Sequence, residues 1–123
     1  MLQMALPQQE LRDRTKTFAL RVMRLYRSLP SAPDVQVVGK QLLRSATSVA
    51  ANHRAAARGR SRQEFAAKIG VVREEADESL FWLELLRDSG LLKPDLLQDL
   101  LQEAKELTAI FTTSYETAKR KMP

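Results

Sequence analysis

Apolar residues recur at alternating steps of three and four along four long segments of this chain, and proline or glycine lies near each break between segments. In the first segment the repeat runs through Leu11, Thr15, Phe18, Val22, Leu25 and Leu29. In the last it runs through Leu97, Leu100, Ala104, Leu107, Phe111, Ser114 and Ala118. Such spacing places the side chains on one stripe of an α-helix. No segment alternates with the two-residue period of a strand, so the sequence predicts an all-α fold.

Helix-starting and helix-ending residues give the expected bounds of four helices, which are about 8–29, 34–58, 61–89 and 94–121. Asp34 is the expected N-cap of the second helix, and Gly59 suits its C-terminal end. Ser61 opens a capping-box sequence, and Pro94 suits the first turn of the fourth helix. Long helices with short connectors pack most simply as an antiparallel up-down four-helix bundle, here a single domain spanning residues 1–123.

The composition excludes several kinds of functional site. The 123 residues include no Cys and one His, which removes disulfides, thiolate nucleophiles and sulfur-based zinc sites. No apolar run approaches the roughly 18 residues of a membrane span, and the start, residues 1–7, lacks the basic region of a secretory signal. We expect a cytoplasmic protein that contacts no membrane, binds no metal or cofactor, has no catalytic residues and is not an enzyme.

The net charge of +5 is distributed unevenly along the chain. Up to Arg73 there are 14 Lys and Arg against 4 Asp and Glu, whereas from Glu74 onward there are 6 against 11. On a helical wheel, the outward side of the second helix is basic, and the run continues through the following turn. The candidate nucleic-acid-binding residues are Lys40, Arg44, Arg54, Arg58, Arg60 and Arg62.

Cations in this arrangement can follow a phosphate backbone, and arginine binds phosphate oxygens in a forked geometry. Aromatic residues do not alternate with the basic ones, so contacts to the backbone are favoured over base stacking. The alternative is a solvated basic face whose side chains pair with the acidic second half of the chain.

An acidic cluster in the third helix consists of Glu74, Glu75, Asp77 and Glu78. Its expected role is to pair with basic residues of a neighbouring helix or subunit. A di-iron bundle would need Glu-x-x-His on two helices, but Ala50 stands three residues before His53, the only histidine. We expect His53 in the core, and Ser45 and Asn52 in interhelical hydrogen bonds.

Residues 80–86 are apolar almost all round the third helix. Leu80 and Leu83 continue the core stripe, but other apolar side chains point to a second side. A bundle of this size has one core, so a second apolar face predicts a subunit interface. The candidate interface residues are Val71, Phe81, Trp82 and Leu85. The alternative is a broad core contact with both neighbouring helices.

Two motifs carry a resemblance to a known family. Residues 44–52 read Arg-Ser-Ala-Thr-Ser-Val-Ala-Ala-Asn, and residues 58–65 read Arg-Gly-Arg-Ser-Arg-Gln-Glu-Phe. This pattern resembles the signature of a bacterial four-helix-bundle family known from proteins encoded in intervening sequences of 23S ribosomal RNA genes. Glu75, Glu78 and Trp82 also fit the third helix of that family. The resemblance extends from about Leu11 to Ala118.

The resemblance implies an up-down bundle that assembles as a homopentamer with a central channel. It also implies kinship with the accessory protein of diversity-generating retroelements, a basic pentamer that associates with a reverse transcriptase and nucleic acid. It supplies no catalytic residues. Many members carry Glu a few residues after the Asn, where this chain has Arg54, Ala55 and Ala56, which makes the local surface more basic.

Two hypotheses of function follow. The first is a non-enzymatic oligomer that binds structured RNA or DNA through phosphate contacts. The second is a protein scaffold or adaptor, for instance for a polymerase, with no direct role in binding nucleic acid.

Overall fold

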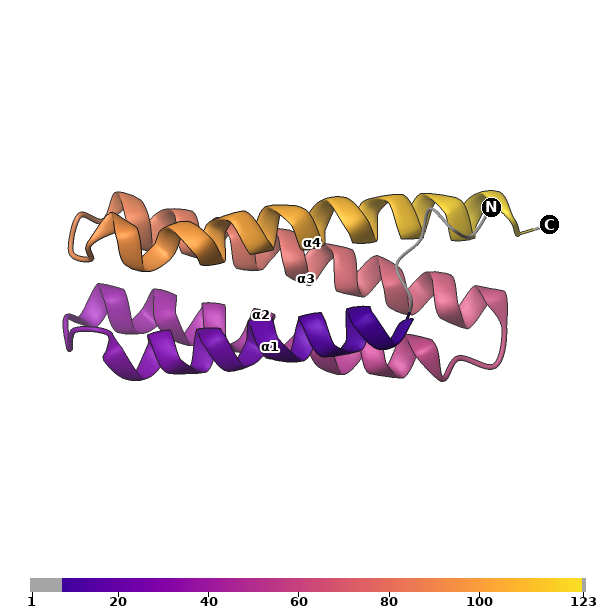
Figure 1. Ribbon diagram of the computed structural model, residues 1–123, viewed down its shortest axis with the longest axis horizontal. Coiled ribbons are helices and arrows are strands. Elements are labelled where there is room, and N and C mark those ends of the chain that lie inside the picture. The colour runs from indigo at the N-terminus through magenta and orange to yellow at the C-terminus, as the bar shows by residue number, and fades with distance from the viewer. Residues whose placement is uncertain (1–7, 123) are drawn as a thin grey trace.

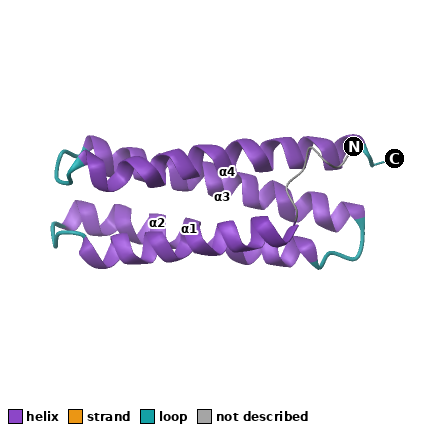
Figure 2. Ribbon diagram, viewed as in Figure 1, coloured by secondary structure: helices purple, strands orange, loops and turns teal. Residues whose placement is uncertain are grey.

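The computed structural model describes residues 8–122, which form four α-helices in sequence. They are α1 (Gln8–Ser28), α2 (Pro33–Ala57), α3 (Arg62–Asp88) and α4 (Pro94–Arg120). Figure 1 shows them running alternately in opposite directions, and the described residues contain no strand (Figure 2). The predicted all-α four-helix bundle is confirmed, and each helix end lies within one residue of its expected position. Residues 1–7, considered above for a secretory signal, lie outside the described part.

Helices that are neighbours in the sequence are also neighbours in space. The most extensive contact joins α2 to α3, followed by α3 to α4 and α1 to α2. The smallest contact joins α1 to α4 and closes the bundle. The side chain of Arg14 crosses this last seam, where it lies 2.9 Å from Glu103 and 2.6 Å from Glu106. Hydrogen bonding to Glu103, and then to Glu106, raises the pKa of Arg14 above its ordinary value, and these contacts join the first helix to the last.

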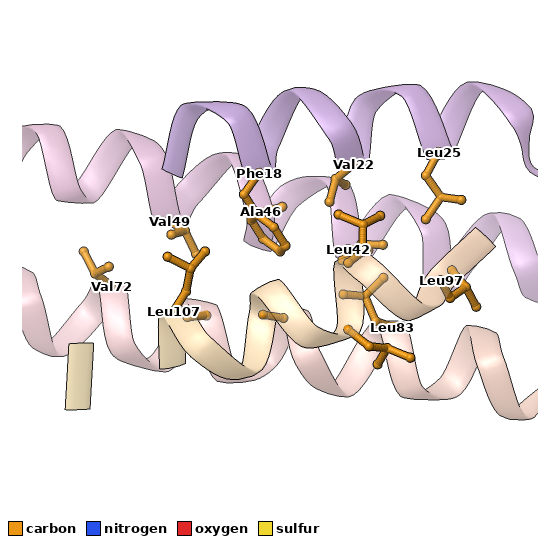
Figure 3. Packing of buried hydrophobic residues seen from close by; sticks show 14 of the residues in the cluster. Phe18, Val22, Leu25, Leu42, Ala46, Val49, Val72, Leu83, Leu97 and Leu107 are labelled. Atoms are coloured by element: carbon orange, nitrogen blue, oxygen red, sulfur yellow. The ribbon is translucent and has the colours of Figure 1, made fainter. Parts of the chain in front are cut away.

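Side chains from all four helices fill one apolar core, part of which Figure 3 shows. All six repeat positions of α1 are buried, as predicted. In α4 the stripe is buried as far as Phe111 and only half-buried at Ser114 and Ala118. In α3 the buried residues form a single stripe with steps of three and four: Ala66, Ile69, Val72, Ala76, Ser79, Leu83 and Leu86. Leu83 is buried as predicted, but Leu80 is only half-buried, and Ser79 is the buried residue at that turn.

The helix starts follow the local sequence, with one correction. Ser61 caps α3 as predicted, since its Oγ accepts a hydrogen bond from the Glu64 N–H at 3.1 Å. Pro94 occupies the first turn of α4, also as predicted. The prediction that Asp34 caps α2 is wrong, because the helix begins at Pro33 and Ala32 is the N-cap. Proline fits this first position because it lacks the N–H that a cap would satisfy.

Candidate nucleic-acid interface

A hydrogen-bonded polar seam joins the outer edges of α2 and α3. We define the polar seam as Arg44, Ser45, Ser48, Asn52, Glu75, Glu78, Ser79 and Trp82. The predicted interhelical bond of Ser45 is confirmed, since its hydroxyl lies 2.8 Å from that of Ser79. The same prediction for Asn52 is wrong, because its amide donates to Ser48 on the same helix.

Of the six predicted nucleic-acid-binding residues, Arg44 is the one that belongs to the polar seam. Its guanidinium donates to Glu75 at 3.1 Å and also to Glu78. Hydrogen bonding to Glu75 is the largest cause of a raised pKa at Arg44. The pKa of Glu78 is lowered, chiefly because the Trp82 indole N–H donates to it at 3.0 Å. The expected pairing of the acidic cluster with a neighbouring helix is thus observed for Glu75 and Glu78, and it engages Arg44.

The other predicted arginines gather at one end of the bundle. Arg54 lies in the last turn of α2, Arg58 and Arg60 lie in the α2–α3 connection, and Arg62 begins α3. All four are exposed, and within residues 8–122 none of them forms an ion pair with a carboxylate. Lys40 is exposed on the same helix, but it precedes Arg54 by 14 positions, which is about 21 Å along a helix.

The same end of the bundle receives three cations that the sequence reasoning did not include. Helix α4 ends at the same end of the bundle as the α2–α3 connection (Figure 1), and the Arg62 guanidinium donates to the Lys121 carbonyl at 3.3 Å. This contact brings the exposed side chains of Lys119, Arg120 and Lys121 to the site. These three cations could have been located from the predicted antiparallel order of the helices, because that order places the C-terminal ends of α2 and α4 at the same end of the bundle.

We define the basic end as the seven exposed residues Arg54, Arg58, Arg60, Arg62, Lys119, Arg120 and Lys121. The two segments that carry them, 54–64 and 116–121, contain only two acidic residues, Glu64 and Glu116. These seven basic and two acidic residues give a net charge of +5. This is the net charge of the whole chain, because the remaining thirteen basic and thirteen acidic residues cancel. The positive charge of this protein is therefore concentrated at one end of an otherwise neutral bundle.

His53 lies in the core beside the basic end, as predicted, and is 1% exposed. Its Nε2 is 3.0 Å from the side-chain oxygen of Gln8, and its ring packs on Phe111 with 5.6 Å between centroids. Burial, followed by the positive charge of Arg12, lowers the pKa of this histidine. Its Nδ1 has no hydrogen-bond partner among the described residues. His53 therefore contributes to packing and stays neutral near pH 7.

The second apolar face predicted for α3 is present on the surface. Val71, Phe81 and Leu85 are 37%, 48% and 38% exposed. Trp82 differs, because it is half-buried against the core and tied to Glu78 within the polar seam. It also meets Phe81 edge to face, with 5.0 Å between ring centroids. We call Val71, Phe81, Trp82 and Leu85 the α3 apolar face.

Metal-ligand clusters and helices able to span a membrane are both absent from residues 8–122. No three His, Asp or Glu side chains gather closely enough to hold a metal ion. None of the four helices combines the length and the apolar character needed to cross a lipid bilayer.

The fold and its charges define a class of protein: an up-down four-helix bundle with a basic end and a polar seam between α2 and α3. Comparison with known families then shows that the chain belongs to the 23S rRNA-intervening sequence protein family, which it matches over residues 8–113. The predicted resemblance to this family is confirmed. A search of curated proteins finds no match.

A solved structure agrees with this assignment. The chain resembles a protein of unknown function from the S23 ribosomal protein family of Bacteroides thetaiotaomicron, whose crystal structure was determined at 1.70 Å resolution. The two are 30% identical with a TM-score of 0.78, and the match covers 85% of this chain and 97% of the other.

Proposed function

We propose that this protein is a non-enzymatic oligomer that binds structured nucleic acid, RNA in particular, through phosphate contacts at the basic end. The observation that carries the proposal is that seven exposed cations and only two carboxylates at one end of the bundle account for the whole net charge of +5. Five of the seven are arginines, whose forked guanidinium suits phosphate oxygens. The family name, which refers to ribosomal RNA, supports RNA as the first nucleic acid to test.

Arg44 and Lys40 have a smaller part in this proposal than the sequence alone predicted. Binding phosphate through Arg44 would require breaking its bonds to Glu75 and Glu78. Lys40 is free to contact a nucleic acid only if that partner extends along α2 from the basic end. The proposed phosphate-binding set is therefore the basic end itself.

The salt dependence of RNA binding tests this proposal. Each neutralised phosphate releases counterions, so engaging four to seven cations gives a slope of roughly −3 to −6 in log K against log salt concentration. The measurement is the affinity for a hairpin RNA between about 50 and 300 mM salt. Absence of binding at the lowest salt, or an affinity that does not change with salt, would contradict the proposal.

We also propose that the chain assembles through the α3 apolar face, with the homopentamer implied by the family resemblance as the expected stoichiometry. Three large apolar side chains exposed on one helix are unusual for a surface that stays in water. Phe81→Glu, at the most exposed of them, is expected to dissociate the assembly without unfolding the subunit. Leu96→Glu is the matched control, because Leu96 is 56% exposed on α4. Sedimentation velocity measures both, and a native mass retained by Phe81→Glu would refute this interface.

The α3 apolar face also favours the second candidate function, a scaffold that binds another protein, such as a polymerase of the kind that the family resemblance implies. A pull-down from nuclease-treated lysate separates the two functions. Retention of a protein partner that depends on Phe81 supports the scaffold, whereas loss of all partners after nuclease treatment supports binding of nucleic acid.

A further inference from the structure

A surface pocket of about 330 Å³ lies between the first turns of α3 and the last turns of α4. It is lined by Gln63, Ala66, Ala67, Tyr115, Lys119 and Met122. The two alanines are small and leave space on the α3 side, while the Tyr115 ring and the Met122 side chain form walls on the α4 side. Lys119 belongs to the basic end, so the pocket opens where the proposed nucleic acid binds.

The backbone of α3 determines where the Tyr115 ring lies. A Cβ atom at Gly70 would stand 2.9 Å from Cε1 of that ring, closer than real side chains approach one another. Glycine at position 70 therefore lets the ring lie directly against α3. Two cations flank it: the Arg73 guanidinium is 4.5 Å and the Lys119 ammonium 5.4 Å from the ring centroid. The result is an aromatic ring held beside fixed positive charge.

The α1–α2 pair of helices also packs a tyrosine on a glycine, but it forms no such site. Tyr26 of α1 lies against Gly39 of α2, where an added Cβ would be 3.2 Å from the ring. Its hydroxyl bonds to the Gln36 side chain at 3.4 Å, and among residues 8–122 no cation stacks on its ring. The flanking cations and the pocket distinguish Tyr115 from this structural counterpart.

We propose that the α3–α4 pocket binds one unpaired nucleotide of a nucleic acid held at the basic end, an inference that rests on the function proposed above. The Tyr115 ring and the two alanines suit a base that takes the place of Lys119 over the ring, and the displaced Lys119 ammonium suits its phosphate. Single-strand binding sites combine these same elements. The volume is at the lower end of the roughly 300–1,000 Å³ of ligand pockets, as expected for a single small group.

The test compares two RNAs with the same number of nucleotides: a blunt two-stranded duplex in which every base is paired, and a shorter duplex with an unpaired tail. The wild-type protein is expected to bind the tailed RNA roughly tenfold more tightly, which is the scale of one base stacking on an aromatic side chain. Tyr115→Leu should bring the ratio of the two affinities to about one. Tyr26→Leu is the matched control and should keep the wild-type ratio.

Each result either supports the pocket or overturns it. Equal affinity of the wild-type protein for both RNAs, or a preference that survives in Tyr115→Leu, overturns the pocket while the proposed function stands. Failure of the wild-type protein to bind either RNA overturns the proposed function and the pocket with it. If Tyr115→Leu does not fold, Ala67→Phe fills the pocket from an exposed position, and the same loss of preference is expected.

Discussion

At the scale of single residues, Arg44 and Arg54 lie on the same helix but have different surroundings. Arg44 is bonded to Glu75, whose side chain is only 17% exposed. Removing Arg44 would leave that carboxylate without its strongest partner in a poorly hydrated position, whereas Arg54 is exposed and forms no ion pair among the described residues. The two arginines therefore serve different purposes, one in folding and one in the proposed binding.

We predict that Arg44→Ala lowers the free energy of unfolding by about 1 kcal/mol, because the lost ion pair is partly exposed and Glu75 still accepts a hydrogen bond from Ser48. Arg54→Ala is the control and should stay within about 0.5 kcal/mol of the wild type. Urea unfolding measures both. Equal stabilities of the two variants would show that the polar seam does not stabilise the bundle.

His53 makes a prediction about pH. Because burial and then Arg12 lower its pKa in the folded protein, the unfolded chain takes up this proton first as the pH falls. The stability is therefore complete above about pH 6.5, the pKa of a free histidine, and declines below it until the lower pKa of the folded state is reached. Each unit by which the folded-state pKa lies below the unfolded-state pKa removes about 1.4 kcal/mol of folding stability at low pH.

The expected result is a lower free energy of unfolding at pH 5.5 than at pH 7.5. His53→Leu should flatten this dependence, although packing changes alter its absolute stability. Chemical unfolding at a series of pH values measures both proteins. An equally steep dependence in His53→Leu would rule out His53 as its source.

At the scale of helices, the start of α3 is the element that positions the basic end. Ser61 accepts the N–H of Glu64, and the Glu64 carboxylate accepts the N–H of Arg60 at 3.1 Å. These two bonds fix the backbone between Arg58 and Arg62, where three of the seven cations lie. A frayed first turn would spread those cations and weaken any shared phosphate site.

We predict that Ser61→Ala costs about 1 kcal/mol of stability, the usual value of a lost N-cap. Ser31→Ala, in the exposed α1–α2 connection, should be nearly neutral and is the control. Thermal or urea unfolding gives both values. A neutral Ser61→Ala would indicate that the backbone at the basic end is fixed by other contacts.

Most of the helix bounds could be predicted from the sequence, because the three-and-four repeat and the effects of Pro and Gly on a helix are local. The start of α2 could not be, since Asp34 and Pro33 both suit a helix start and the sequence does not decide between them. The burial of Ser79 in place of the predicted Leu80 depends on packing against α2, where its hydroxyl lies 2.8 Å from that of Ser45. The exposure of Phe81 and the half-burial of Trp82 reflect the same tertiary packing.

At the scale of the whole molecule, the charge distribution depends on both sequence and fold. Four of the six predicted binding residues lie together because they are close in the sequence. Lys119, Arg120 and Lys121 join them only because α4 runs antiparallel to α3. The pairing of Arg44 and the position of Tyr115 beside two cations depend on contacts between helices, which a helical wheel for one helix does not contain. The assembled surface therefore combines local and long-range effects.

The central claim is that the position of the positive charge, and not its total, gives this protein its affinity for nucleic acid. Two double variants test it, because each removes two exposed arginines: Arg58→Ala with Arg60→Ala at the basic end, and Arg24→Ala with Arg27→Ala near the opposite end.

The measurement is the dissociation constant of each double variant for the same hairpin RNA near 0.1 M salt. The basic-end pair is expected to lose at least roughly tenfold in affinity, because each lost phosphate contact costs close to that factor at this salt concentration. The opposite pair should change by no more than about twofold, because charges beyond the Debye length of about 10 Å are screened. Equal losses from the two pairs would contradict the account.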